Sequence, residues 1–226
     1  MRRILLKILE KAILLISKDL EVSENSETCF MKILNPMDRI DYQHFEKHTK
    51  RWHTKFLGIK QGHTYWVYKV IDDILGENRH IKGIIEIGTG FGALSVFLGL
   101  ECYERNLKPL LTFDTEKINI PRLFSLLNIE FIIQDCFSEE SVKKIREYSN
   151  VPVLFICDGG NKIKEFNQFA YLLPKGSIIA AHDWTHEIYY EAIEDTIKKL
   201  ELEQVKKETW CAFPDYILMS FWKKTK

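Results

Sequence analysis

Residues 83–93 have the sequence GIIEIGTGFGA, in which a short apolar run is followed by three alternating glycines. Together with the apolar residues among 94–100, this pattern predicts a buried strand, a tight turn and then a helix. Glycine adopts positive φ angles and lets a ligand approach the backbone, while the first N–H groups of a helix attract negative charge. The stretch is therefore typical of a turn that binds a small-molecule cofactor.

Two cofactor templates fit this turn. Residues 88–93 satisfy the pattern G-x-G-x-x-G/A, and Asp114 follows about 20 residues after it, as in dinucleotide-binding proteins. The same turn also satisfies E-x-G-x-G through Glu86, Gly88 and Gly90. The turn alone does not distinguish the two templates, so the distinction depends on the rest of the chain.

After the turn, strand-like and helix-like segments alternate. We expect strands at 110–114, 129–133, 151–157 and 177–181, and helices at 121–127, 138–148, 163–173 and 187–200. Two further strand-like runs, at 203–210 and 216–222, predict a closing antiparallel hairpin. The predicted fold is α/β: a doubly wound, Rossmann-like, mostly parallel seven-stranded sheet with a C-terminal antiparallel hairpin and an N-terminal helical cap.

The N-terminal region has a different character. Residues 1–57 are predicted to form an amphipathic helix with a cap and linker, and residues 58–226 the cofactor-binding domain. Charged residues interrupt the apolar run of residues 1–20, which argues against a transmembrane span or a signal peptide. We expect this helix to dock on the domain or on a second subunit, with attachment to a membrane surface as the alternative.

Composition narrows the function classes. The 226 residues include 32 basic and 32 acidic side chains, so no overall charge favours nucleic acid as a partner. The five cysteines are scattered and lack C-x-x-C spacing. They are expected to be buried thiols in a reducing compartment, which predicts a cytoplasmic protein.

The closing hairpin separates the two templates, because it differs from the second half of a classical dehydrogenase. From about residue 58 to 222 the chain resembles the class I S-adenosylmethionine-dependent methyltransferases. The residues that carry the resemblance are 86–90 (EIGTG), 158–160 (DGG) and 174–183 (PKGSIIAAHD). The nearest branch is that of catechol O-methyltransferase and the cephalosporin hydroxylase, macrolide and rhamnosyl O-methyltransferase group.

The resemblance implies a set of residues that bind S-adenosylmethionine. Glu86, Gly88, Thr89 and Gly90 would surround its methionine part, and Asp114 would accept both ribose hydroxyls, since a carboxylate can share its two oxygens between neighbouring donors. Asp135 would lie beside the adenine. The loop that contains Gln61 would close over the cofactor.

The acids that end the next two strands suggest a second centre. Asp158 and Asp183 would emerge on the same edge of the sheet and could hold a divalent cation, Mg²⁺ or Mn²⁺. Relatives carry a further oxygen ligand where this chain has His182, so the alternatives are a His-containing site suited to Mn²⁺, Fe²⁺ or Zn²⁺, or no metal. Asp158, His182 and Lys162 are the predicted catalytic residues.

The sequence therefore predicts an enzyme that transfers a methyl group from S-adenosylmethionine to a hydroxyl of a small molecule or sugar. Asn161 occupies a position where relatives often have a base, which leaves Lys162, His182 or His186 as base candidates. Two other readings stay open: a nicotinamide-dependent oxidoreductase, and a protein that binds S-adenosylmethionine without turnover.

Overall fold

The computed structural model describes residues 55–57, 59–60, 62–63, 65–117, 122–206 and 218–226. The helix expected at residues 1–20 and nearly all of the predicted N-terminal cap lie outside these ranges. The boundary expected near residue 57 stays a prediction for the same reason.

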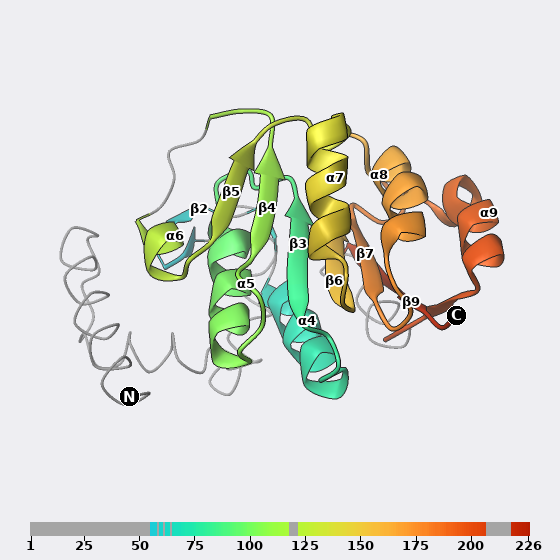
Figure 1. Cartoon of the computed structure of the whole chain (residues 1–226), viewed down its shortest axis with the longest axis horizontal. Coiled ribbons are helices and arrows are strands. Elements are labelled where there is room, and N and C mark those ends of the chain that lie inside the picture. Colours follow the sequence, from blue (N-terminus) through green and yellow to red (C-terminus); the bar gives the residue numbers. More distant parts are fainter. Residues whose placement is uncertain (1–54, 58, 61, 64, 118–121, 207–217) are drawn as a thin grey trace.

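A seven-stranded sheet forms the centre of the fold (Figure 1). Its strands, in chain order, are β3 (Gly83–Ile87), β4 (Leu111–Asp114), β5 (Glu130–Ile133), β6 (Val153–Cys157), β7 (Ile178–His182), β8 (Leu202–Gln204) and β9 (Met219–Lys224). β3 and β6 are buried along their whole length, as expected of strands that helices cover on both faces. A separate antiparallel pair, β1 (Lys55–Phe56) and β2 (Ile59–Lys60), was not predicted from the sequence.

The strands lie in the order β5-β4-β3-β6-β7-β9-β8. The first five are parallel, and β9 runs antiparallel to both β7 and β8. This order confirms the predicted mostly parallel sheet with its C-terminal antiparallel pair. It also brings the carboxyl ends of β3, β4, β5, β6 and β7 to one edge, where open α/β sheets bind ligands.

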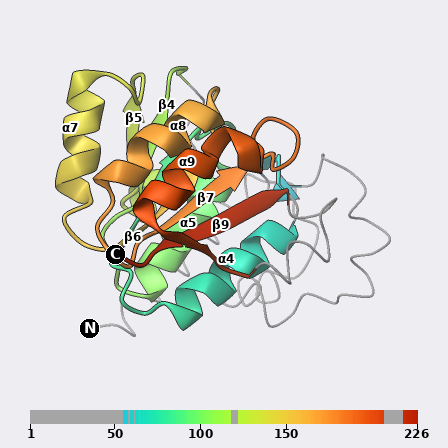
Figure 2. The same cartoon turned by 90° about the vertical axis from the view of Figure 1, so that its right-hand side faces the viewer.

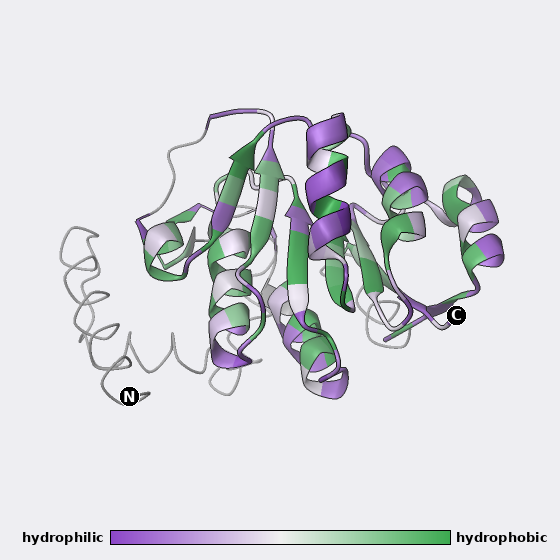
Figure 3. Cartoon of the chain, viewed as in Figure 1, coloured by the Kyte–Doolittle hydropathy of each residue, from purple (hydrophilic) through white to green (hydrophobic). Residues whose placement is uncertain are grey.

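Helices cover the two faces of the sheet (Figure 2). The face formed by alternate residues such as Ile84 packs with α4 (Tyr65–Glu77), α5 (Ala93–Glu104) and α6 (Leu123–Leu126). The face that includes Ile85 packs with α7 (Glu139–Tyr148), α8 (Lys162–Phe169) and α9 (Tyr190–Leu200). Figure 3 shows the consequence in composition, with hydrophobic central strands and a largely hydrophilic α7.

Several element boundaries differ from the predictions. α6 covers only Leu123–Leu126 of the helix expected at 121–127, and α8 ends at Phe169, where a 3₁₀ turn at Ala170–Leu172 follows, instead of running to residue 173. α9 begins at Tyr190 rather than at residue 187, because Asp183 and Thr185 take positive φ angles of 54° and 72° and turn the chain sharply after β7. β8 is confined to Leu202–Gln204, and residues 207–217 of the predicted hairpin lie outside the described ranges.

Two expectations about the character of the chain also bear on the fold. Cys102, Cys136 and Cys157 are buried free thiols, as predicted for these three. Among the described residues, none of the helices combines the length and the apolarity needed to cross a bilayer.

Candidate active site at the carboxyl edge of the sheet

The glycine turn connects β3 to α5 by three left-handed positions. Gly88, Gly90 and Gly92 have φ angles of 90°, 53° and 83°, which residues other than glycine rarely adopt. A Cβ atom on Gly88 would lie 2.2 Å from the carbonyl oxygen of Asp158, so glycine is what lets the ends of β3 and β6 meet. At Gly90 a Cβ would meet no atom within 4 Å. The turn is therefore packed at its base and open at its tip.

Glu86 lies beneath this turn rather than on its surface. Its side chain is completely buried, and one carboxyl oxygen accepts hydrogen bonds from the hydroxyls of Ser95 at 2.5 Å and Thr112 at 2.6 Å. Burial raises the pKa of Glu86 to about 8, against the opposing effect of these two donors. The other oxygen, Oε1, has no hydrogen-bond partner among the described residues. None of the described residues thus satisfies this buried oxygen at the base of the turn.

The remaining predicted cofactor residues lie in several environments. The buried Thr89 hydroxyl pairs with that of Thr112 at 2.7 Å, so its side chain faces the interior. Asp114 ends β4 and accepts from the Gly90 N–H at 2.9 Å, which joins it directly to the glycine turn. Asp135 follows the neighbouring strand, is exposed, and accepts from the Phe137 N–H at 2.9 Å. Gln61 lies outside the described residues.

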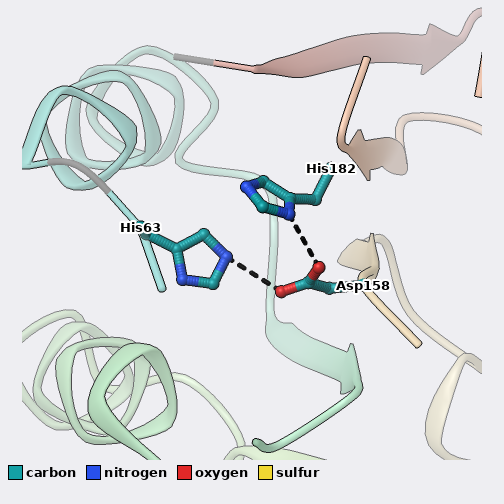
Figure 4. A group of neighbouring side chains, drawn as sticks. All are labelled: His63, Asp158 and His182. Carbon is teal, nitrogen blue, oxygen red and sulfur yellow. Dashed lines mark hydrogen bonds and ion pairs between the residues drawn. The ribbon is translucent and has the colours of Figure 1, made fainter. Parts of the chain in front are cut away.

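Asp158 follows the end of β6, and its carboxylate lies between two histidines (Figure 4). Its Oδ2 lies 2.8 Å from Nε2 of His63, and its Oδ1 lies 2.8 Å from Nδ1 of His182. Both imidazole rings therefore point at one carboxylate, one ring to each oxygen. His182 is the last residue of β7, and His63 lies just before α4, 95 residues away from Asp158.

Lys162 contacts the acids of this site. Its ammonium lies 2.7 Å from Oε2 of Glu187, 3.1 Å from Oδ2 of Asp183 and 3.9 Å from Oδ1 of Asp158. It also donates to the Gly159 carbonyl at 3.0 Å, and only 6% of its side chain is exposed. The Lys162 ammonium therefore lies within 4 Å of both strand-end acids.

These contacts set the protonation states. Burial alone would raise the pKa of Asp158, but His182 and His63 outweigh burial and lower it well below the usual range. Burial would lower the pKa of His182, but Asp158 and Asp183 raise it to about 10. The pKa of His63 is instead lowered, by burial first and by His182 second.

The same balance applies to Lys162. Burial would lower its pKa, whereas Glu187, Asp158 and Asp183 together raise it. A lysine in this environment stays charged at neutral pH, and this disfavours the role of general base that the sequence left open for it. An ammonium held beside two strand-end acids can instead stabilise negative charge on a nearby oxygen.

Local structure explains how the acids are positioned. Asp183 sits at a φ of 54°, a region that aspartate tolerates better than bulky residues do, and its carbonyl accepts from the N–H groups of His186 and Glu187, both at 2.9 Å. This turn brings Glu187 back to Lys162. Asn161 caps α8 by accepting from the Lys164 N–H at 3.0 Å, which gives it a structural role.

The structure thus brings four predicted residues together: Asp158, Lys162, His182 and Asp183. His186 is exposed and contributes its backbone N–H to the turn.

Sequence reasoning missed His63 as a member of this group. The available signal was its place in the segment expected to close over the cofactor, but only the tertiary structure pairs it with Asp158.

A second residue that sequence reasoning missed is Glu165. Its buried carboxylate accepts from the N–H groups of Gly159 at 3.2 Å and Asn161 at 3.1 Å, and burial raises its pKa to about 6. A Cβ on Gly159 would lie 2.4 Å from Oε1 of Glu165. Glu165 therefore fixes the backbone that follows Asp158, and its position one turn into α8 was the only sequence signal for that role.

The pair of acids implied by the resemblance does not fit a hard, oxygen-ligated Mg²⁺ ion. The Asp183 carboxylate already contacts Lys162, and its Oδ2 lies 3.3 Å from Nδ1 of His182. The potential ligand atoms that do converge are those of His63, Asp158 and His182. Two of these three are imidazole nitrogens, whereas Mg²⁺ prefers oxygen ligands.

Comparison with known proteins supports the fold. A structure of CmcI with SAH (S-adenosylhomocysteine) is 15% identical and has a TM-score of 0.57, covering 77% of this chain and 84% of CmcI. An apo-structure of CmcI is 18% identical, with a TM-score of 0.53 and 76% of each chain covered. A scan against protein-family models and a search of curated proteins both find no match. The chain therefore shares the fold of CmcI, a Rossmann-like α/β fold with a mostly parallel seven-stranded sheet, which agrees with the predicted fold.

Proposed function

We propose that this protein transfers a methyl group from S-adenosylmethionine to a hydroxyl group of a small molecule. One observation carries the proposal: the glycine turn and the Asp158 group are in direct contact, because Gly88 packs against the Asp158 backbone. A cofactor at the turn and an acceptor beside Asp158 would therefore be neighbours. Alignment of donor and acceptor is the main requirement of this reaction, since the sulfonium of S-adenosylmethionine supplies an already electrophilic methyl group.

The turn has the features that S-adenosylmethionine requires. α5 begins at Ala93, and its N-cap residue Gly92 provides no side-chain cap, so the first N–H groups and the positive end of the helix dipole suit a carboxylate such as that of methionine. Gly90 borders open space, and Asp114 lies beside it with acceptor capacity beyond its bonds to the Gly90 and Glu116 N–H groups. CmcI, whose fold is similar, has been solved with SAH.

We assign the acceptor side to the residues around Asp158. Asp158 and His182 orient the acceptor hydroxyl, and Lys162 stabilises negative charge that develops on its oxygen. The methyl group passes from the sulfonium to this oxygen, SAH leaves, and the hydroxyl proton is released to water. Glu165 keeps the Asp158–Gly160 backbone in place through Gly159. The acceptor is a small molecule or a sugar, in keeping with the resemblance.

Calorimetric titration with S-adenosylmethionine, SAH and NADH tests the cofactor. We expect S-adenosylmethionine and SAH to bind and NADH not to bind. The reason is that β9 lies antiparallel between β7 and β8, where a dehydrogenase would continue its parallel sheet. Tight binding of NADH alone would favour the oxidoreductase alternative and overturn the proposal.

Turnover is tested by incubating the protein with S-adenosylmethionine and a panel of hydroxylated compounds and by measuring SAH release. Asp158→Asn should lower the rate by about 10²-fold or more while cofactor binding persists. The matched control is Asp195→Asn, an exposed acid on α9. Cofactor binding without SAH release across the panel would identify a binding protein without turnover.

A further inference from the structure

We propose that His63, Asp158 and His182 form a three-ligand binding site for a divalent transition-metal ion. The site itself does not depend on methyl transfer. Only its use in catalysis rests on the proposed function: three protein ligands leave a coordination position for water or for the acceptor hydroxyl, whose acidity the ion would increase.

The geometry of the three side chains is the first argument. Their potential ligand atoms all lie within 4.8 Å of one another, and each imidazole nitrogen is 2.8 Å from an Asp158 oxygen (Figure 4). Ligands bound tetrahedrally at about 2.0–2.1 Å from a zinc ion are about 3.3 Å apart. The spacing of the three potential ligand atoms is therefore close to that of ligands around one metal ion.

The chemistry of the ligands is the second argument. Two imidazoles and one carboxylate suit Zn²⁺, Fe²⁺, Co²⁺ or Mn²⁺, whereas sites for Mg²⁺ are made of oxygen. The set is held by rigid elements at two positions, the ends of β6 and β7, and by the segment before α4 at the third. A bound ion would thus join that segment to the edge of the sheet.

The charge of the surroundings is the third argument. Asp158, Asp183 and Glu187 are three carboxylates, and the Lys162 ammonium contacts all of them. When both histidines are neutral, as metal binding requires, three negative charges against one ammonium leave two negative charges. A divalent cation would balance this charge. The balance matters most at Asp158 and Asp183, whose side chains are 12% and 21% exposed, because water screens them less than it screens the 60% exposed Glu187.

Direct binding of Co²⁺ and Zn²⁺ to the full-length, chelator-treated protein tests the site. Cobalt is added first, because its visible absorption reports the ligands and the coordination number without any cofactor or acceptor present. We expect one equivalent of Co²⁺ to bind, to be displaced by Zn²⁺, and to be unaffected by excess Mg²⁺. Failure to bind either transition metal stoichiometrically, or displacement by Mg²⁺, would overturn the proposal.

Two variants test the histidine ligands, and a third variant is the control. His63→Gln keeps a hydrogen-bonding side chain of similar size and should weaken Co²⁺ binding at least about tenfold. His182→Gln should do the same, whereas His186→Gln removes an exposed histidine close to the site and should leave affinity unchanged. Retained SAH binding and an unchanged circular dichroism spectrum establish that each variant is folded. Equal Co²⁺ affinity for wild type and His63→Gln would remove His63 from the site and refute the three-ligand assignment. These experiments measure no methyl transfer, so a failure to bind metal would leave the proposed function intact. In the same way, a failure to detect methyl transfer would leave the metal site intact.

Discussion

Glu86→Gln should change how the stability of this protein depends on pH. The carboxyl group of Glu86 is fully buried in β3 and its pKa is raised to about 8. In the unfolded chain the same group has its ordinary pKa of 4.5. Between these values the native state holds a proton that the unfolded state has lost, so unfolding releases a proton and stability falls as the pH rises. Glutamine has nearly the same shape but no such proton.

The size of the effect follows from the two pKa values. A carboxyl group whose pKa is about 8 instead of 4.5 makes the native state less stable by up to about 5 kcal/mol above pH 8. The amide of glutamine can still accept from Ser95 and Thr112, but its buried NH₂ group takes the place of an oxygen without a partner, at a cost of about 1–3 kcal/mol. The variant should therefore be less stable than wild type at pH 5 and more stable by about 2–4 kcal/mol at pH 9.

Urea unfolding of both proteins at pH values from 5 to 9 measures this difference. Subtracting one series from the other cancels the titration of all groups that the two proteins share. Glu203→Gln, an exposed acid on β8, is the matched control and should show no comparable change with pH. A stability difference that stays constant across the series, or one that turns against the variant as the pH rises, would refute the assignment of a raised pKa to Glu86.

Three further predictions concern the turn, the cofactor and the N-terminal region. Gly88→Ala should destabilise the protein by roughly 3 kcal/mol or more, because its Cβ would collide with the Asp158 carbonyl, whereas Gly90→Ala should cost only about 1–2 kcal/mol for its left-handed φ angle; similar midpoints in urea for the two variants would contradict this. Asp114→Ala should weaken S-adenosylmethionine binding by roughly 1.5–3 kcal/mol in calorimetry, and an unchanged affinity would remove Asp114 from the cofactor site. Deletion of residues 1–20 should cause association or loss of solubility, which size-exclusion chromatography measures; a soluble truncated protein of unchanged size would argue for a detachable anchor instead.

The sequence alone was sufficient for the order of strands and helices and for the glycine turn. These features depend on local patterns: apolar runs, the spacing of glycines, and acids placed directly after strands. Because parallel strands end at one edge of a sheet, the same patterns also predicted that Asp158, His182 and Asp183 would be close. The start of α9 was the main error, since the left-handed turn at Asp183 has no signal in hydrophobic periodicity.

Only the tertiary structure decided which side chains interact and in what protonation state. His63 reaches Asp158 from 95 residues away, and no spacing rule relates the two positions. The sequence left Lys162 as a candidate base. In the structure its three acidic neighbours raise its pKa, so that it stays charged at neutral pH. The physical reason is that pKa values depend on burial and on charges within a few ångströms, and those distances are set by packing between elements that the chain sequence keeps far apart.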